Sequence, residues 1–236
     1  MKTLLPVIPL LLTLVAFMPL QASAQPSLEQ EYAFETQHGL YPCHWVCTGD
    51  TLRADTNDEG IVGHLISGLW VSCYEIPQEL WSFTMGSNPS PLVGDDLPVT
   101  AVSRAEVDSF CLRISRTTHR HWRLPSKEEW LFIYHGGLLS EDYRFCGSNR
   151  PEWVAWYRGT SGGQLHPVGQ RIPNELRIFD MLGNAAEMVT DGDSIRFMGG
   201  SCLDPSPRNN PDHLVSHAPP DVQGFRIVCS EPQWIF

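Results

Sequence analysis

The stretch WRLPSKEEWLFIYHGG, residues 122–137, carries a full set of helix signals in a chain that has few of them. Ser126 and Glu129 form a capping box, in which the serine accepts a hydrogen bond from a backbone N–H of the first turn while the glutamate reaches back to the N-cap. Apolar side chains follow at helical spacing from Trp130 to Tyr134, and two glycines end the pattern. We predict a short amphipathic helix that begins after Ser126.

A second capping box occurs earlier in the chain, and the rest of the sequence is interrupted by glycine and proline and lacks long helical periodicity. Ser103 and Glu106 form a second capping box, followed by apolar residues at helical spacing. Pro77 suits the first position of a third, shorter helix. Beyond residue 137 only short strands are indicated, such as residues 225–228, and glycine and proline number 19 each. The sequence therefore predicts an α+β fold that is rich in loops and has few helices.

The first 24 residues are typical of a secretory signal peptide. Lys2 precedes an apolar run over residues 4–17, and Ala22-Ser23-Ala24 matches a cleavage signature. A membrane anchor is the alternative, but prolines interrupt the run, which is also short for a span. We expect cleavage, no transmembrane segment in the mature chain, and export to the periplasm, the outer surface or the medium.

Charge and cysteine content limit the partners and the redox state. The formal charge of the chain is −11, and Lys127 is the only lysine outside the signal peptide. Nucleic acid is an unsuitable partner, because its binding needs clustered positive charge. Export permits disulfides, yet seven cysteines cannot all pair within one chain. The seven are Cys43, Cys47, Cys73, Cys111, Cys146, Cys202 and Cys229.

Six stretches of the chain, in order, resemble the signature blocks of the formylglycine-generating enzyme superfamily, also called sulfatase-modifying factor domains. They are YEIPQELWSFTMGSNPS (74–90), LPVTAVSRAEVDSFC (97–111), WRLPSKEEWLFIYHGG (122–137), HPVGQRIPNELRIFDMLGNAAEM (166–188), FMGGS (197–201) and GFRIV (224–228). The resemblance implies a variant of the C-type lectin-like fold over residues 70–236. Residues 25–69 form an N-terminal segment in which the resemblance is faint.

The resemblance also implies which residues would perform chemistry. Enzymes of the superfamily oxidise a sulfatase cysteine to formylglycine with two cysteines that bind copper(I), three and eight residues after the serine of the Gly-Gly-Ser block. Counted from Ser201, these positions hold Asp204 and Asn209. A carboxylate and a carboxamide are hard oxygen donors that hold soft copper(I) poorly. We therefore expect no copper and no formylglycine chemistry, that is, a pseudoenzyme.

Cys202, beside Ser201, supplies the alternative. A loop could absorb the shift of two positions, and Ser201 and Cys202 would then serve an oxidase with an atypical thiol. The other interpretation of Cys202 is a structural cysteine, either buried as a small apolar residue or paired in a disulfide, for which Cys229 is a candidate partner.

A calcium site is a further implication of the resemblance. Family members bind calcium through side chains at the positions of Asp180 and Glu187 and through backbone carbonyls at those of Gly183 and Ala185. Calcium prefers several oxygen ligands at once, and both carboxylates are present. The alternative is that Asp180 caps a turn beside Gly183 while Glu187 is solvated.

These observations favour an exported, non-catalytic binding or scaffold protein whose partner is a protein or a glycan of the cell envelope or exterior. The segment 203–222, which in the family lines the substrate cleft, is polar and stiffened by proline, so we expect Arg208, Asn209, Asp212 and His213 to form a binding loop. An ordinary surface connection is the alternative for this loop. Two enzymatic hypotheses compete with the binding function. One is the oxidase, and the other is a related ergothioneine-type sulfoxide synthase. The synthase needs an additional helical domain, and residues 25–70 are too short to form it.

Overall fold

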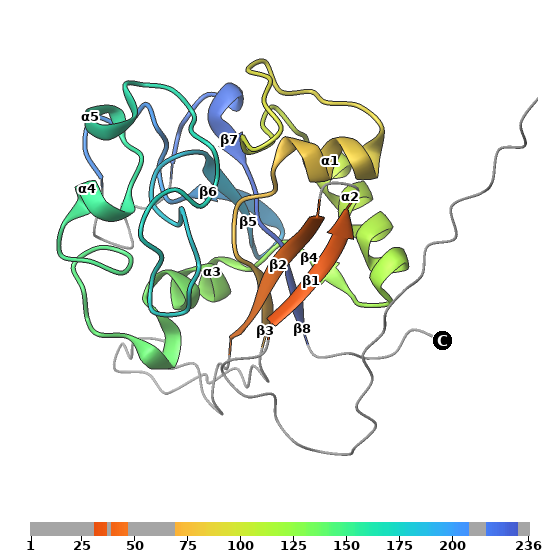
Figure 1. The fold of residues 1–236 in the computed structure, drawn as a ribbon, viewed down its shortest axis with the longest axis horizontal. Coiled ribbons are helices and arrows are strands. Elements are labelled where there is room, and N and C mark those ends of the chain that lie inside the picture. The colour runs from red at the N-terminus through yellow and green to blue at the C-terminus, as the bar shows by residue number, and fades with distance from the viewer. Residues whose placement is uncertain (1–30, 37–38, 47–68, 208–215, 231–236) are drawn as a thin grey trace, which may run out of the picture.

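The protein combines two small sheets with short helices and long connections (Figure 1). The structure is a computed structural model that describes residues 31–36, 39–46, 69–207 and 216–230. A five-stranded antiparallel sheet has the order β1-β2-β3-β8-β4, and a three-stranded sheet has the order β6-β5-β7. The predicted α+β class with few helices is confirmed.

The first sheet contains β1 (Glu31–Thr36), β2 (Gly39–Val46), β3 (Leu69–Ser72), β4 (Trp122–Arg123) and β8 (Val228–Ser230). The second contains β5 (Ala186–Asp191), β6 (Ser194–Met198) and β7 (Gln223–Gly224). The α-helices are α1 (Gln78–Met85), α2 (Arg104–Thr118), α3 (Lys127–Tyr134), α4 (Pro151–Val154) and α5 (Arg158–Ser161). Two 3-10 turns, η1 (Gly137–Leu139) and η3 (Pro220–Val222), complete the described elements.

Both capping boxes form, and both predicted helices begin where their serines place them. In α3, the backbone N–H of Glu129 donates to Ser126 Oγ at 3.2 Å, and the backbone N–H of Ser126 donates to a Glu129 carboxylate oxygen at 2.8 Å. Ser103 and Glu106 make the equivalent pair at the start of α2. Pro77 lies one position earlier than expected, at the N-cap of α1 rather than at its first helical residue.

The predicted strand over residues 225–228 is largely wrong, for a topological reason. The chain leaves β7, which pairs with β5 in one sheet, and enters β8, which pairs with β3 and β4 in the other. Residues 225–227 span the gap between the sheets, and backbone carbonyls of Phe225 and Ile227 accept hydrogen bonds outside any regular ladder. Apolar residues in a crossing segment look like a buried strand in the sequence.

The N-terminal hairpin is part of the domain. Strand β2 pairs with β3 in a register that sets Cys43 opposite Ser72, so β1 and β2 extend the main sheet (Figure 1). Strands β1 and β2 therefore belong to the same sheet as β3, β4 and β8. Residues 1–24, on which the signal-peptide prediction depends, lie outside the described ranges.

The core consists of two large apolar clusters and one small one. The first contains the stacked rings of Trp81 and Phe110, from α1 and α2, with Phe225 edge-on against both. The second surrounds Trp130 of α3. The third joins Leu165, Ala185, Cys202 and Val222. No helix among the described residues is both long and apolar enough to cross a membrane.

Candidate functional site

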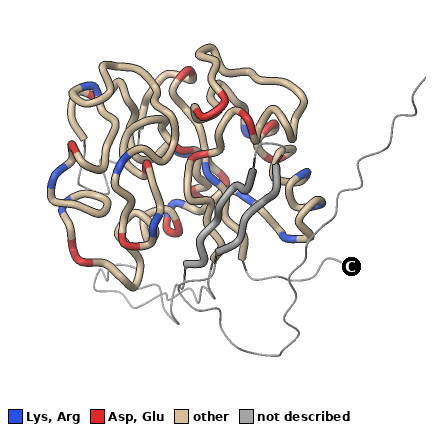
Figure 2. Tube along the Cα trace, in the orientation of Figure 1, with Lys and Arg blue, Asp and Glu red and all other residues tan. Residues whose placement is uncertain are grey.

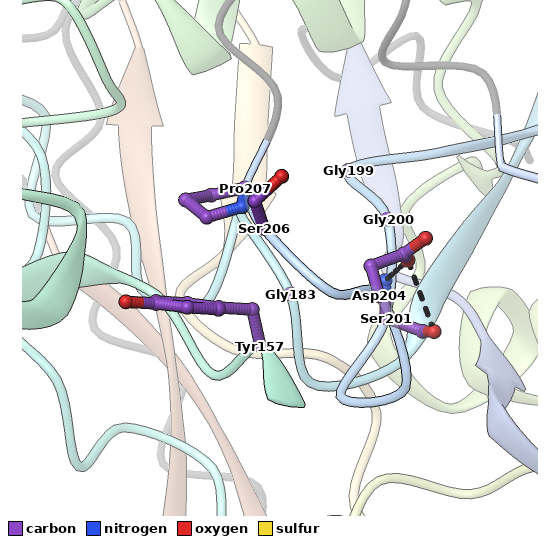
Figure 3. Close-up of a pocket in the computed structure, with 8 residues that line it drawn as sticks. All are labelled: Tyr157, Gly183, Gly199, Gly200, Ser201, Asp204, Ser206 and Pro207. Atoms are coloured by element: carbon purple, nitrogen blue, oxygen red, sulfur yellow. Dashed lines mark hydrogen bonds between the residues drawn. The ribbon is translucent and has the colours of Figure 1, made fainter. Parts of the chain in front are cut away.

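A small hollow lies at the turn that follows β6, where the sequence predicted the altered active site (Figure 3). Its lining residues are Tyr157, Gly183, Gly199, Gly200, Ser201, Asp204, Ser206 and Pro207. Its volume is about 10 Å³, which is room for about one water molecule.

Close backbone packing forms one wall of this hollow. The N–H of Gly183 donates to the carbonyl of Gly199 at 3.0 Å, and that of Asn184 donates to the carbonyl of Trp156 at 2.8 Å. Gly183 has a φ of +83°, and a Cβ added there would lie 2.2 Å from the Trp156 carbonyl oxygen. Only glycine permits this approach.

The resemblance puts Asp204 at the position of the first copper-binding cysteine, and the structure shows that its carboxylate is held by the turn. One oxygen, Oδ2, accepts from the backbone N–H of Ser201 at 2.6 Å and from Ser201 Oγ at 3.1 Å (Figure 3). The carbonyl of Asp204 accepts from the N–H of Arg158 at 2.9 Å. Asp204 therefore acts as a turn-stabilising residue. Asn209, at the second cysteine position, lies outside the described residues, as do Arg208, Asp212 and His213.

Cys202 does not line the hollow. The side chain is completely buried beside Leu165, Ala185 and Val222, and burial raises the pKa of its thiol to about 12, with the carboxylate of Glu75 adding to the effect. Because the thiolate is the reactive form of cysteine, the geometry favours a structural role. The candidate disulfide with Cys229 is wrong: both thiols are free, and Cys229 belongs to a different cluster.

A buried group of charges lies behind the hollow and was missed at the level of sequence. Arg226 is completely buried and donates through Nε and Nη2 to the two carboxylate oxygens of Glu187, which also accepts from Trp130 Nε1 at 2.6 Å. Glu75 is equally buried, and its carboxylate accepts from Asn184 Nδ2 at 2.7 Å and from the N–H of Ala185 at 2.8 Å. An arginine and a glutamate within otherwise apolar stretches were the available signal.

Asp180 belongs to the same group. It has a φ of +55°, and its Oδ2 accepts from the N–H of Gly169 at 2.6 Å. Its Oδ1 is buried and has no hydrogen-bond partner among the described residues. Burial raises the pKa of Asp180 to about 6, and burial together with Asp180 and Glu187 raises the pKa of Glu75 well above its usual range.

Comparison with known proteins identifies the family to which this domain belongs. The family model described as "Sulfatase-modifying factor enzyme 1-like domain" matches residues 33–230. The chain belongs to this family. Two curated relatives of the family were found: the chaperone protein LppX of Paenibacillus barcinonensis and the inactive C-alpha-formylglycine-generating enzyme 2 of Mus musculus. The first is 27% identical over 58% of this chain, and the second is 26% identical over 53%. The chain spans 66% and 44% of the lengths of these relatives.

Solved structures share the fold. Treponema denticola variable protein 1 has a TM-score of 0.70 and 19% identity, and the match covers 85% of this chain and 99% of that one. PvdO from Pseudomonas aeruginosa has a TM-score of 0.63 and 16% identity over 85% of this chain and 98% of its own. CarF has a TM-score of 0.60 and 20% identity over 79% and 97%. These likenesses support the fold that the sequence blocks implied.

The two carboxylates that the resemblance assigns to calcium, those of Asp180 and Glu187, are both buried. Both oxygens of Glu187 bond to the guanidinium group of Arg226, so this carboxylate is already neutralised by a buried cation. Within the described ranges, no group of three or more histidine, cysteine, aspartate and glutamate side chains is placed to hold a metal ion. The alternative prediction of a solvated Glu187 is wrong, because its exposed fraction is 1%. Asp180 does act on a turn, through Gly169 rather than Gly183.

Proposed function

We propose that this chain is an exported, non-catalytic binding or scaffold protein of the cell envelope or exterior, built on the family's domain. The observation that carries the proposal is Asp204. Where a catalytic member needs a soft thiolate, this chain has a carboxylate committed to Ser201 in a turn. Copper(I) favours sulfur ligands, so this position offers it little.

The surroundings of Asp204 support the same conclusion. The hollow beside it is small, with a volume of about 10 Å³. The neighbouring Cys202 is buried with a pKa raised to about 12, so it is protonated near neutral pH. Oxidation through an atypical thiol would need this residue to leave the core.

A binding function is supported by the kind of relatives that the chain resembles. One carries the name of a chaperone and the other that of an inactive enzyme. A fold can lose its chemistry and keep a binding role because function resides in the loops and surfaces that it presents. The proposed partner is a protein met after export, and the pattern of residues 1–24 supports the export.

The decisive experiment is oxidation of a synthetic peptide that carries the sulfatase cysteine motif. The purified mature protein is incubated with the peptide, copper(I) and oxygen, beside a Cys202→Ser variant, and formylglycine is measured by mass spectrometry. We expect no product from either protein. Product from the parent that disappears in the variant would establish the oxidase and overturn the proposal. A catalytically active member of the family, assayed in parallel, shows that the conditions support the reaction.

A further inference from the structure

A surface at α4 combines an exposed tryptophan with an exposed isoleucine. The side chain of Trp153 is 48% exposed and that of Ile172 is 52% exposed. The N–H of Ile172 donates to the carbonyl of Trp153 at 3.0 Å, so the two residues lie side by side although they come from different segments. With Arg150 and Arg171 they form what we call the Trp153 surface.

The two arginines of this surface are held in place by the protein. The guanidinium carbon of Arg150 lies 4.8 Å from the centre of the Trp153 ring. Arg171 donates through Nη1 to the carbonyl of Glu152 at 2.8 Å, and its guanidinium carbon lies 3.6 Å above the ring of Trp156. The other partner of Trp156 is His166, stacked at 3.7 Å. An interface formed here would therefore lose little side-chain entropy at Arg171.

The Trp153 surface has positively charged side chains, although the chain as a whole is negatively charged. Residues 143–174 contain four arginines and a single carboxylate, Glu152, in a chain of formal charge −11. Figure 2 shows blue positions along the edge of the molecule where α4 and α5 lie. Four other arginines in the described ranges are ion-paired, namely Arg104, Arg123, Arg196 and Arg226. Arg150 and Arg171 make no ion pair with a described carboxylate.

From these observations we propose that the Trp153 surface docks an acidic segment of a partner protein. An apolar side chain of the segment packs on Trp153 and Ile172, and neighbouring carboxylates pair with Arg150 and Arg171. Arginine suits this role because its planar guanidinium group bonds carboxylates in fixed geometry. The inference rests on the proposed binding function and specifies the partner that it uses.

A protein segment is favoured over an anionic glycan by the composition of the surface. Tryptophan and arginine dominate the energetics of protein–protein interfaces, where a few such residues supply most of the binding energy. The Trp153 surface offers an isoleucine as well as the indole. A curated relative also carries the name of a chaperone.

The test uses the full mature chain and a bead-displayed library of random peptides. We expect the parent to select peptides in which aspartate or glutamate flanks a leucine or phenylalanine. One selected peptide is then synthesised, and its affinity is measured by fluorescence polarisation. Trp153→Ala and Arg150→Gln should each weaken binding by about tenfold or more. Binding should also weaken as salt is raised, because exposed charges are screened.

Matched control variants are available on the far side of the molecule. Phe83→Ala removes an aromatic side chain of α1 that is 52% exposed, and Arg116→Gln removes an exposed arginine of α2 (Figure 1). Both should bind the selected peptide like the parent. Circular dichroism and the unfolding midpoint of every variant show whether it is folded, and Ile172→Ser provides a second disruption of the surface.

Each other outcome overturns the inference. The inference fails if the protein selects basic or uncharged peptides or selects none. It also fails if the Trp153 and Phe83 variants bind the peptide with equal affinity, or if the protein binds an oligogalacturonate probe in place of the peptide. If Arg208→Gln and His213→Gln abolish binding while the Trp153 variants retain it, the partner site is the loop 203–222. In that case the proposed binding function stands and the Trp153 surface fails. Formylglycine production, by contrast, would remove the proposed function itself.

Discussion

Arg226 shows how the stability of the molecule depends on single buried charges. Its guanidinium group bonds to both oxygens of Glu187 and also donates to the backbone carbonyls of Ser72 and Phe179, at 3.1 and 2.8 Å. These carbonyls belong to segments more than a hundred residues apart in the sequence. The arginine therefore links β3, β5 and the crossing segment from which it comes.

Replacing Arg226 with methionine should destabilise the protein strongly. The variant leaves the Glu187 carboxylate buried without its cation, which costs about 3–5 kcal/mol in comparable sites. The double variant Arg226→Met, Glu187→Leu removes both charges, so it should lose less stability than Arg226→Met alone. Urea unfolding followed by tryptophan fluorescence measures both. If the single and double variants are equally stable, the ion pair is not what holds this region together.

The buried carboxyl group of Asp180 should make the free energy of unfolding depend on pH. Its pKa is raised from an ordinary value of 3.8 to about 6, chiefly by burial, so the folded protein binds this proton more tightly than the unfolded chain. The free energy of unfolding should therefore decrease as pH rises from about 4 to about 6, by on the order of 2 to 3 kcal/mol. Above that range the loss is complete.

The variant Asp180→Asn isolates this contribution, because it cannot ionise. Its unfolding free energy should vary less between pH 4 and 6 than that of the parent, although the raised pKa of Glu75 acts in the same direction and leaves part of the dependence. Asp193→Asn, which changes an exposed aspartate, is the control and should follow the parent. An Asp180→Asn variant whose stability changes with pH as steeply as that of the parent would contradict the assignment.

At the scale of elements, the parts predicted well were those with local causes. The boxes at Ser103 and Ser126 fix helix starts because donor and acceptor lie three residues apart. The strand over 225–228 failed because its backbone partners are set by two sheets assembled from distant segments. The sequence alone could not say that residues 225–227 bridge them.

The same distinction applies to the candidate site. Asp204 could be placed at the altered active site by counting from Ser201, since both belong to one turn. The ion pair of Arg226 and Glu187 joins residues 39 positions apart, and nothing in their spacing indicated it. Likewise, Cys202 and Ser201 are neighbours in sequence, yet only the assembled core decides that the serine lines the hollow while the cysteine does not.

At the scale of the whole molecule, the chain has the family's domain, and the proposed loss of chemistry concerns only its loops. The two sheets and the buried charges form a frame that spans most of the matched residues 33–230. The turn at Asp204 and the surface at α4 lie on loops and short helices outside the two sheets. Such loops can change without loss of the core, since they contribute few of its buried apolar contacts.

The response to calcium gives a prediction for the molecule as a whole. A site occupied at a hundredfold excess of ligand over its dissociation constant adds about 2.7 kcal/mol, and each kcal/mol raises the melting temperature of a chain of this size by about 2–4 °C. Because Arg226 already neutralises Glu187, we expect equal melting temperatures in EDTA, in millimolar magnesium and in millimolar calcium. A rise of about 5 °C or more that is specific to calcium would reveal a site. If Asp180→Asn abolished the rise, the metal would lie beside Arg226 despite its charge, and if the variant retained it, the metal would bind elsewhere in the chain.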